Sequence, residues 1–162
     1  QTDDWSQPVR VAALSSTKTD LPGGSDGDRL SFILSSRREG LSDIFMATRT
    51  QVDSEWADVT RLPINSNCED RGPSLNENGL ILLWSSNGDA RCGSLDYDLH
   101  VAFRQSNADT FTFREENQVA LSAVNSPTAN EGDPWLSPDG SYLVLASDRD
   151  GNPSRLYQTY RE

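Results

Sequence analysis

Carboxylate and amide side chains gather in two polar segments of this 162-residue chain, each placed just before a short proline-containing stretch. The residues in these segments whose side chains could do chemistry are Asn65, Glu69, Asp70, Arg71, Asn125, Glu131 and Asp133. An oxygen-rich set of this kind favours calcium over zinc, and it also suits a polar ligand such as a sugar. The sequence therefore predicts a rim of ligand-binding candidates on two related loops.

A structural interpretation of the same residues competes with this one. Ser15 and Asp20 stand at the matching places near the start of the chain, so the pattern recurs. Residues that recur in every repeat usually bond the loops and cap the turns. We favour this interpretation, and it predicts no catalytic residue, no metal site and no cofactor, with calcium as the one cofactor that the rim could admit.

A catalytic alternative rests on the loop carboxylates. Glu69 and Glu131 could form the carboxylate pair that a glycan-active hydrolase or lyase would need. No Ser/His/Asp order, phosphate-binding glycine loop or zinc spacing is present in the sequence. The recurring Asp43 and Asp98 read as structural partners of Arg37 and Ser85, and the single histidine, His100, replaces an aromatic residue of a strand and is expected to pack between sheets.

The chain has two cysteines, Cys68 and Cys92, which are too few for a tetrahedral zinc set. Both fall on loops expected to open on the same face, so they could meet in a disulfide, although two free thiols fit the count equally well. The formal net charge of −11 argues against nucleic-acid and anionic membrane partners. No apolar run approaches the ~20 residues that cross a bilayer. The sequence shows no basic-then-apolar leader, so we expect that any export signal has been removed or was never present.

A sequence motif that predicts a strand, a turn, a second strand and a second turn occurs three times along the chain. Its clearest copy is Asp133 to Gly151, in which Pro138-Asp139-Gly140 makes a tight turn before the apolar strand Tyr142 to Ser147. Strands with apolar residues on both faces belong to sheets that are covered on both sides. A repeat of roughly 50 residues with four strands and no helical period is typical of β-propeller blades. A two-sheet sandwich is the alternative fold, but its strands would alternate more cleanly.

These repeats resemble those of the TolB-like propellers, whose pattern is Pro-x-x-Ser-Pro-Asp-Gly, an apolar strand, Ser-x-Arg-x-Gly and Asp-Ile/Leu-Tyr. The third copy matches at Pro134, Ser137, Pro138, Asp139, Gly140, Ser147, Arg149 and Gly151. The first copy matches at Gly27, Ser35, Arg37, Gly40, Asp43, Ile44 and Phe45, and the middle copy at Pro73, Gly79, Ser85, Gly88, Asp98 and Leu99. In the middle copy Asn87 stands at the place of the arginine. The resemblance implies an all-β propeller and says little about activity.

The strand count predicts one domain over residues 1–162, with four parts. A second half-repeat (1–24) is followed by two repeats (25–75 and 76–136) and a first half-repeat (137–162), which together make three blades of four antiparallel strands. Three blades cannot close a ring, and TolB-like rings typically have six. We therefore expect a homodimer in which a strand around Val9 to Leu14 completes the unfinished blade of a second copy, unless the chain is a piece of a longer protein.

The function expected from these features is that of a non-enzymatic binding module, located in the periplasm or outside the cell. Its partner would be a protein or a polar ligand such as a carbohydrate, bound through the loop face. Nucleic-acid binding and membrane insertion are not expected.

Overall fold

A computed structural model describes residues 4–57, 59–88 and 96–161 of the chain. Ten β-strands, one short α-helix and one 3₁₀ turn make up the regular structure of these residues. The strands are β1 (Asp20–Ser25), β2 (Ser31–Ser36), β3 (Asp43–Thr48), β4 (Thr60–Arg61), β5 (Asp70–Leu75), β6 (Ile81–Ser86), β7 (Asp98–Phe103), β8 (Glu131–Leu136), β9 (Tyr142–Ser147) and β10 (Arg155–Tyr160). The helix α1 (Glu115–Gln118) leads directly into the 3₁₀ turn η1 (Val119–Leu121). No helix of the described residues is long and apolar enough to cross a membrane.

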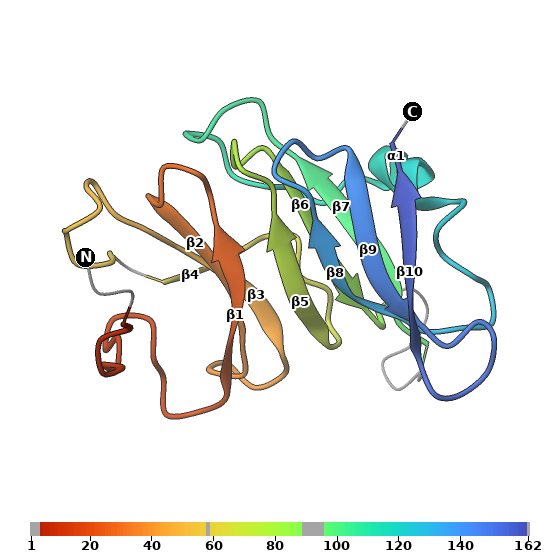
Figure 1. Cartoon of the computed structure of the whole chain (residues 1–162), viewed down its shortest axis with the longest axis horizontal. Coiled ribbons are helices and arrows are strands. Elements are labelled where there is room, and N and C mark those ends of the chain that lie inside the picture. Colours follow the sequence, from red (N-terminus) through yellow and green to blue (C-terminus); the bar gives the residue numbers. More distant parts are fainter. Residues whose placement is uncertain (1–3, 58, 89–95, 162) are drawn as a thin grey trace.

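The strands form three antiparallel meanders in chain order. The first sheet has the order β1-β2-β3-β4, the second β5-β6-β7 and the third β8-β9-β10. Figure 1 shows the three sheets side by side, and the first strands β1, β5 and β8 contact one another in turn. Gly23 on β1 makes one of these contacts possible, because a Cβ there would lie 2.6 Å from Pro73 of β5. The predicted all-β arrangement of propeller-type blades is confirmed.

The predicted fourth strands are wrong in two of three places. Only the first sheet has one, the two-residue β4. In the second sheet the segment Val119–Leu121 is the turn η1, because the side-chain amide of Gln118 already bonds both backbone groups of Val101 on β7, at 3.1 and 3.0 Å. Around Val9 to Leu14 there is no strand either, and Val9 is 86% exposed. A strand needs a partner edge for its backbone groups, and the described chain offers none there.

Tight turns between the first and second strands of each sheet form as the sequence predicts. The side-chain oxygens of Asp26 and Asn76 each accept hydrogen bonds from two backbone N–H groups at the start of the next strand. Ser137 does the same for the N–H of Tyr142 in the third turn, at 2.9 Å. Gly140 has a φ of 74°, which only glycine adopts without strain, as the Pro-Asp-Gly phrase required.

The middle sheet is covered on both faces. Leu82 and Trp84 of β6 pack with Ile33 and Ile44 of the first sheet. On the other face, Leu83 of the same strand packs with residues of the third sheet, including Leu143 and Leu145 of β9. This explains why the second strands lack apolar-polar alternation, and it is the packing that propeller blades require.

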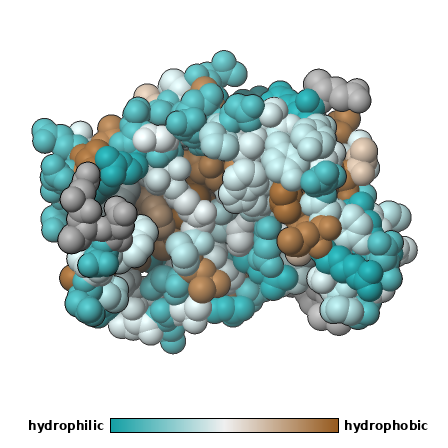
Figure 2. All heavy atoms as spheres, in the orientation of Figure 1, coloured by the Kyte–Doolittle hydropathy of each residue, from teal (hydrophilic) through white to brown (hydrophobic). Residues whose placement is uncertain are grey.

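The far face of the third sheet is open in the described chain. Leu156 is 78% exposed, although the residues at the same place in the other two sheets, Ile44 and Leu99, are fully buried. Trp135 and Tyr160 are also exposed, and their rings flank Tyr142, with centroids 6.1 and 4.9 Å from its ring. The surface in Figure 2 is otherwise largely polar, with apolar side chains gathered in a few places.

We predict that Leu99→Ala and Leu156→Ala differ strongly, although the two residues occupy equivalent places. Leu99→Ala leaves a cavity between two sheets and should lower the free energy of unfolding by about 2 to 5 kcal/mol. Leu156→Ala should change it by less than about 0.5 kcal/mol in dilute protein, because its side chain is already in water. Urea unfolding followed by tryptophan fluorescence measures both values, and equal losses would contradict the burial pattern.

Candidate functional site

The loop face of the molecule consists of the segments that lead into β1, β5 and β8 together with the loops that follow β2, β6 and β9. The strand register brings these loops together, since Asp20 pairs with Ser36, Asp70 with Ser86 and Glu131 with Ser147. In Figure 1 this face forms the lower edge of the three sheets. The predicted rim residues all lie on it or on the strands that begin there.

A carboxylate begins the first strand of each sheet, half-buried at Asp20 and fully buried at Asp70 and Glu131, and we call it and its polar partners the carboxylate cluster of that sheet. In the first sheet Asp20 accepts hydrogen bonds from Ser16 N (2.6 Å) and Ser36 Oγ (2.6 Å). In the third sheet Glu131 accepts from Ser126 N (3.0 Å) and Ser147 Oγ (2.7 Å). The carboxylate thus joins the incoming loop to the end of the second strand.

An arginine completes the cluster in the first and third sheets. Arg38 bonds Ser36 Oγ (2.9 Å), Asp20 (3.0 Å) and the carbonyl of Leu14 (2.8 Å), and its guanidinium lies 4.9 Å from the Phe45 ring centroid. Arg149 repeats this geometry in the third sheet. It bonds Ser147 Oγ (3.1 Å), Glu131 (3.0 Å) and the carbonyl of Val124 (2.6 Å), and it lies 4.8 Å from the ring of Tyr157. The arginine of the first repeat is therefore Arg38, and its expected assignment to Arg37 was wrong by one residue.

The middle sheet keeps the carboxylate, and none of its described residues supplies the arginine. Asp70 is fully buried and accepts from Ser66 N (2.7 Å), Ser66 Oγ (2.9 Å) and Trp84 Nε1 (3.2 Å). Gly88 occupies the place of Arg38 and Arg149, two residues after the serine that ends the second strand. Asp70 makes no ion pair with any residue that the structure describes.

A cleft of about 450 Å³ lies beside Asp70, where the other two sheets hold an arginine. Its lining joins the carboxylate cluster to an aromatic wall and consists of Pro63, Ile64, Asn65, Ser66, Asp70, Trp84, Ser86, Gly88, His100, Phe113 and Glu115. The His100 ring takes the place of Phe45 and Tyr157, stacked on Trp84 at 5.5 Å and 5.7 Å from Phe113. As expected from the sequence, His100 packs on the face of the middle sheet that meets the first sheet.

The electrostatics of Asp20 and Asp70 differ chiefly because Asp70 is fully buried and Asp20 is half-buried. Burial acts to raise the pKa of Asp20, but hydrogen bonds from Ser36, Ser16 and Arg38 outweigh it and lower that pKa to about 2. For Asp70, burial prevails over the hydrogen bonds and raises the pKa above its ordinary value. The middle carboxylate therefore sits in a site that favours an added positive charge.

Two of the predicted rim residues hold the sheets together. Asn65 accepts from Ile44 N (2.6 Å) and donates to Ile44 O (2.9 Å), which continues the edge of β3 beyond β4. Asn125 makes the same pair of bonds to Leu99 of β7, both at 2.9 Å. An amide side chain thus takes the place of a strand residue in both sheets.

The remaining rim residues divide between ion pairs and open positions. Glu69 pairs with Arg37 at 2.7 Å and joins the first sheet to the second. Arg71 stacks on Tyr97, with its guanidinium 3.7 Å from the ring centroid, and makes no ion pair within the described residues. Asp133 is exposed and has a positive φ of 48° in the irregular part of β8. Asp43, expected beside Arg37, instead pairs with Arg61 at 2.7 Å.

Cys68 is buried and disulfide-bonded. Its predicted partner, Cys92, lies outside the described residues, so the pairing itself stays a prediction. No group of three or more possible metal ligands occurs among residues 4–57, 59–88 and 96–161.

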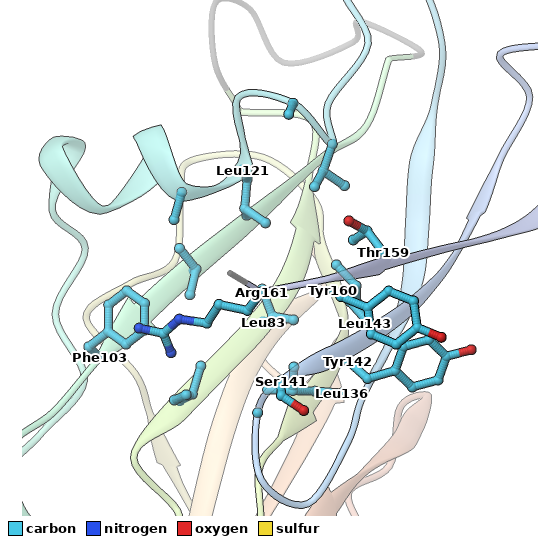
Figure 3. A pocket seen from close by; sticks show the side chains of 16 residues that line it. Leu83, Phe103, Leu121, Leu136, Ser141, Tyr142, Leu143, Thr159, Tyr160 and Arg161 are labelled. Atoms are coloured by element: carbon cyan, nitrogen blue, oxygen red, sulfur yellow. The ribbon is translucent and has the colours of Figure 1, made fainter.

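A second, apolar cavity of about 200 Å³ lies between the second and third sheets. Figure 3 shows Leu83 and Leu121 on its walls, with Tyr142 and Tyr160 side by side near its mouth. The Arg161 side chain extends toward Phe103, and its guanidinium lies 5.7 Å from that ring. None of the described residues that line this cavity is a carboxylate, and it continues the packing of the core.

Sequence reasoning missed the residues that make the middle cleft distinctive, Trp84, Gly88 and Phe113. A signal for them was present in the repeats, because a position-by-position comparison shows glycine where two other copies have arginine. The one-residue error that chose Arg37 over Arg38 also assigned the substitution to Asn87. Correct pairing of the serines at the ends of β2, β6 and β9 reveals it.

Two solved structures have the same fold as this chain. TolB from Acinetobacter baumannii is similar with a TM-score of 0.53 and 20% identity, covering 84% of this chain and 28% of that one. A TolB candidate from Agrobacterium tumefaciens has a TM-score of 0.56 and 15% identity, covering 91% of this chain and 52% of that one. The chain thus spans about half or less of the structures that it matches. No family model and no curated protein sequence matches it.

The three sheets and these similarities give the chain a TolB-like propeller fold. At these identities the likeness concerns the fold alone.

We predict that Asp20→Asn and Asp70→Asn change the pH dependence of stability in opposite directions. The folded pKa of Asp20 is about 2, below its ordinary 3.8, so its stabilisation is present above pH 4 and is lost as the pH falls toward 2. Asp20→Asn should therefore lower the free energy of unfolding at pH 7 by about 1.5 to 3 kcal/mol and flatten the acid limb.

The raised pKa of Asp70 acts the other way, because its ionisation costs stability as the pH rises above 4. Asp70→Asn should then become relatively more favourable with rising pH. Urea unfolding at a series of pH values compares the two variants, and the same sign of pH dependence in both would contradict the assignment.

Proposed function

We propose that the chain is a non-enzymatic, TolB-like propeller module that binds a protein segment or a polar ligand through its loop face. One observation carries this proposal, the cleft of about 450 Å³ beside Asp70. Trp84, Phe113 and Glu115 give it an apolar wall and a second carboxylate, which is the mixture that ligand pockets use for affinity and orientation. The equivalent places in the neighbouring sheets are filled by Arg38 and Arg149.

The loop carboxylates support binding over glycan hydrolysis. Glu131 is fully buried and bonded by Ser126, Ser147 and Arg149, and Glu69 is held by Arg37. A hydrolytic pair needs two carboxyl groups on either side of a sugar bond, one of them free to give a proton. Both glutamates already serve the joints between loops and strands, so we do not assign them a catalytic role.

An oxidising compartment, periplasmic or extracellular, fits the module best. Cys68 is disulfide-bonded, and disulfides persist mainly outside the reducing cytosol. The acidic surface, with a formal net charge of −11, favours cationic or polar partners over nucleic acid.

The binding proposal predicts a response at the Trp84 indole N–H, which donates to Asp70 inside the cleft. Nitrogen-15 NMR titration with methylammonium, methylguanidine, acetate, glucose and triglycine should give a saturable shift of this signal with at least one probe. Phe113→Ala should weaken that binding at least threefold, because it removes part of the wall. Val119→Ala, on an exposed position outside the cleft, is the matched control. The proposed function would be overturned if none of the five probes shifted the Trp84 indole signal.

A second copy of the chain is the partner that we propose for the open face of the third sheet. Strand β3 has its outer edge paired with β4 and Asn65, and β7 has its edge bonded by Gln118 and Asn125. In the described chain β10 pairs only with β9. The open face of the third sheet corresponds, position for position, to the faces of the first and second sheets that are buried against the next sheet. Another blade would therefore pack on it in the same way.

The amino-terminal segment supplies the complementary element of such a dimer. Arg38 bonds the carbonyl of Leu14 as Arg149 bonds that of Val124, so residue 14 lies at the equivalent place in the segment that leads into a first strand. Residues 4–11 have no strand partner in the described chain. Placed along β10 of a second copy, they would complete its sheet, and two sets of three sheets would close a six-bladed ring.

We predict a mass of twice 17.9 kDa by multi-angle light scattering at micromolar concentration. Leu156→Glu should give a monomer, because it puts a charge in the centre of the proposed interface between the two copies. Val119→Glu, at a similarly exposed position on η1, should leave the dimer intact. A monomeric wild-type chain at tens of micromolar would contradict the dimer and would assign the open face to another occupant.

A further inference from the structure

The cleft beside Asp70 has the dimensions and chemistry of a site that an arginine fills elsewhere in the same molecule. The clusters of the first and third sheets show what such a site contains: a buried carboxylate, a serine hydroxyl at the end of the second strand, a backbone carbonyl and an aromatic ring. Arg38 and Arg149 satisfy all four groups with the same atoms and nearly the same distances. Two independent copies thus define the geometry.

The middle sheet retains all four kinds of group. Asp70 is the carboxylate and Ser86 the hydroxyl, Ile64 stands where Leu14 and Val124 offer their carbonyls, and His100 is the ring. Within the described part of the chain the arginine is missing, and Gly88 stands at its place. A glycine there has no side chain that could reach the carboxylate, so the space remains as the cleft.

Charge and aromatic contacts both favour a cation in this space. Asp70 is fully buried without an ion pair among the described residues, whereas Asp20 and Glu131 each have one. Taking a carboxylate out of water is unfavourable unless a cation accompanies it. Glu115 adds a second negative charge to the lining, and a planar cation would lie well against aromatic rings.

We propose that the cleft binds a guanidinium group supplied from outside the described fold, most simply the arginine side chain of a partner protein segment. The inference rests on the proposed binding function and adds its ligand class. A guanidinium would donate in one plane, from separate nitrogens, to Asp70, Ser86 and the carbonyl of Ile64, whereas the three donors of an ammonium group leave one nitrogen in tetrahedral directions. Arg38 and Arg149 show that this arrangement forms readily.

The test compares a guanidinium with a matched ammonium by NMR titration of the Trp84 indole N–H. Methylguanidine should bind at least tenfold more tightly than methylammonium, and the tripeptide Gly-Arg-Gly at least tenfold more tightly than Gly-Lys-Gly. Glu115→Gln, at the rim of the cleft, should weaken methylguanidine binding several-fold without unfolding the chain. A tripeptide that binds more tightly than methylguanidine assigns the natural ligand to a peptide segment, and equal affinities assign it to a small guanidinium compound.

A chemical-rescue control uses the neighbouring cluster. Arg149→Ala removes the same guanidinium from the third sheet and should lower the thermal midpoint. Millimolar methylguanidine should restore part of this loss and methylammonium should not, which would establish that these clusters select the planar cation. Absence of rescue would count against the chemistry proposed for the middle sheet.

One result would overturn the guanidinium assignment while leaving the binding function intact. It is equal or tighter binding of methylammonium, glucose or triglycine at Trp84.

Discussion

The carboxylate that begins the first strand of each sheet is the interaction on which the rest of the structure depends. Asp20, Asp70 and Glu131 each accept a hydrogen bond from a serine N–H of the incoming loop, and Asp20 and Glu131 also accept one from the serine hydroxyl at the end of the second strand. A buried carboxylate without such bonds would cost several kcal/mol. The requirement to satisfy it fixes where the loop turns and where the first strand starts.

The contacts between neighbouring sheets are made in the same region, at the start of the first strands. The N–H of Asp70 bonds the carbonyl of Ser42 at 2.7 Å, and that of Glu131 bonds the carbonyl of Tyr97 at 2.6 Å, so each first strand is tied to the sheet before it. Asn65 and Asn125 then bond the outer strand of that preceding sheet. Most residues of the polar rim therefore stabilise the fold. Function in such a molecule has to be sought where one repeat departs from the others.

The middle sheet is the place where the departure is largest. Its neighbours pair the carboxylate with an arginine, whereas within the described residues Asp70 accepts hydrogen bonds from the backbone N–H and hydroxyl of Ser66 and from the indole of Trp84. With glycine at position 88, a cleft lies beside a buried carboxylate that makes no ion pair within the described residues and whose pKa is raised by burial. A cavity beside a buried carboxylate lowers the stability of the folded chain. Binding of a cationic ligand would explain why the two occur together.

Sequence alone determined the strands and their stacking, because apolar residues on both faces of the segments around Leu34, Leu83 and Leu145 leave no other role for them. It also placed the turns, since glycine and proline act locally. The sequence alone did not show that fourth strands are missing, because Gln118 and Asn125 occupy the edge of β7 through contacts between residues that are distant in sequence. Only the tertiary structure decided that Asp70, Gly88, His100 and Phe113 share one cleft: they come from separate strands and loops, and spacing along the chain carries no measure of the distance across it.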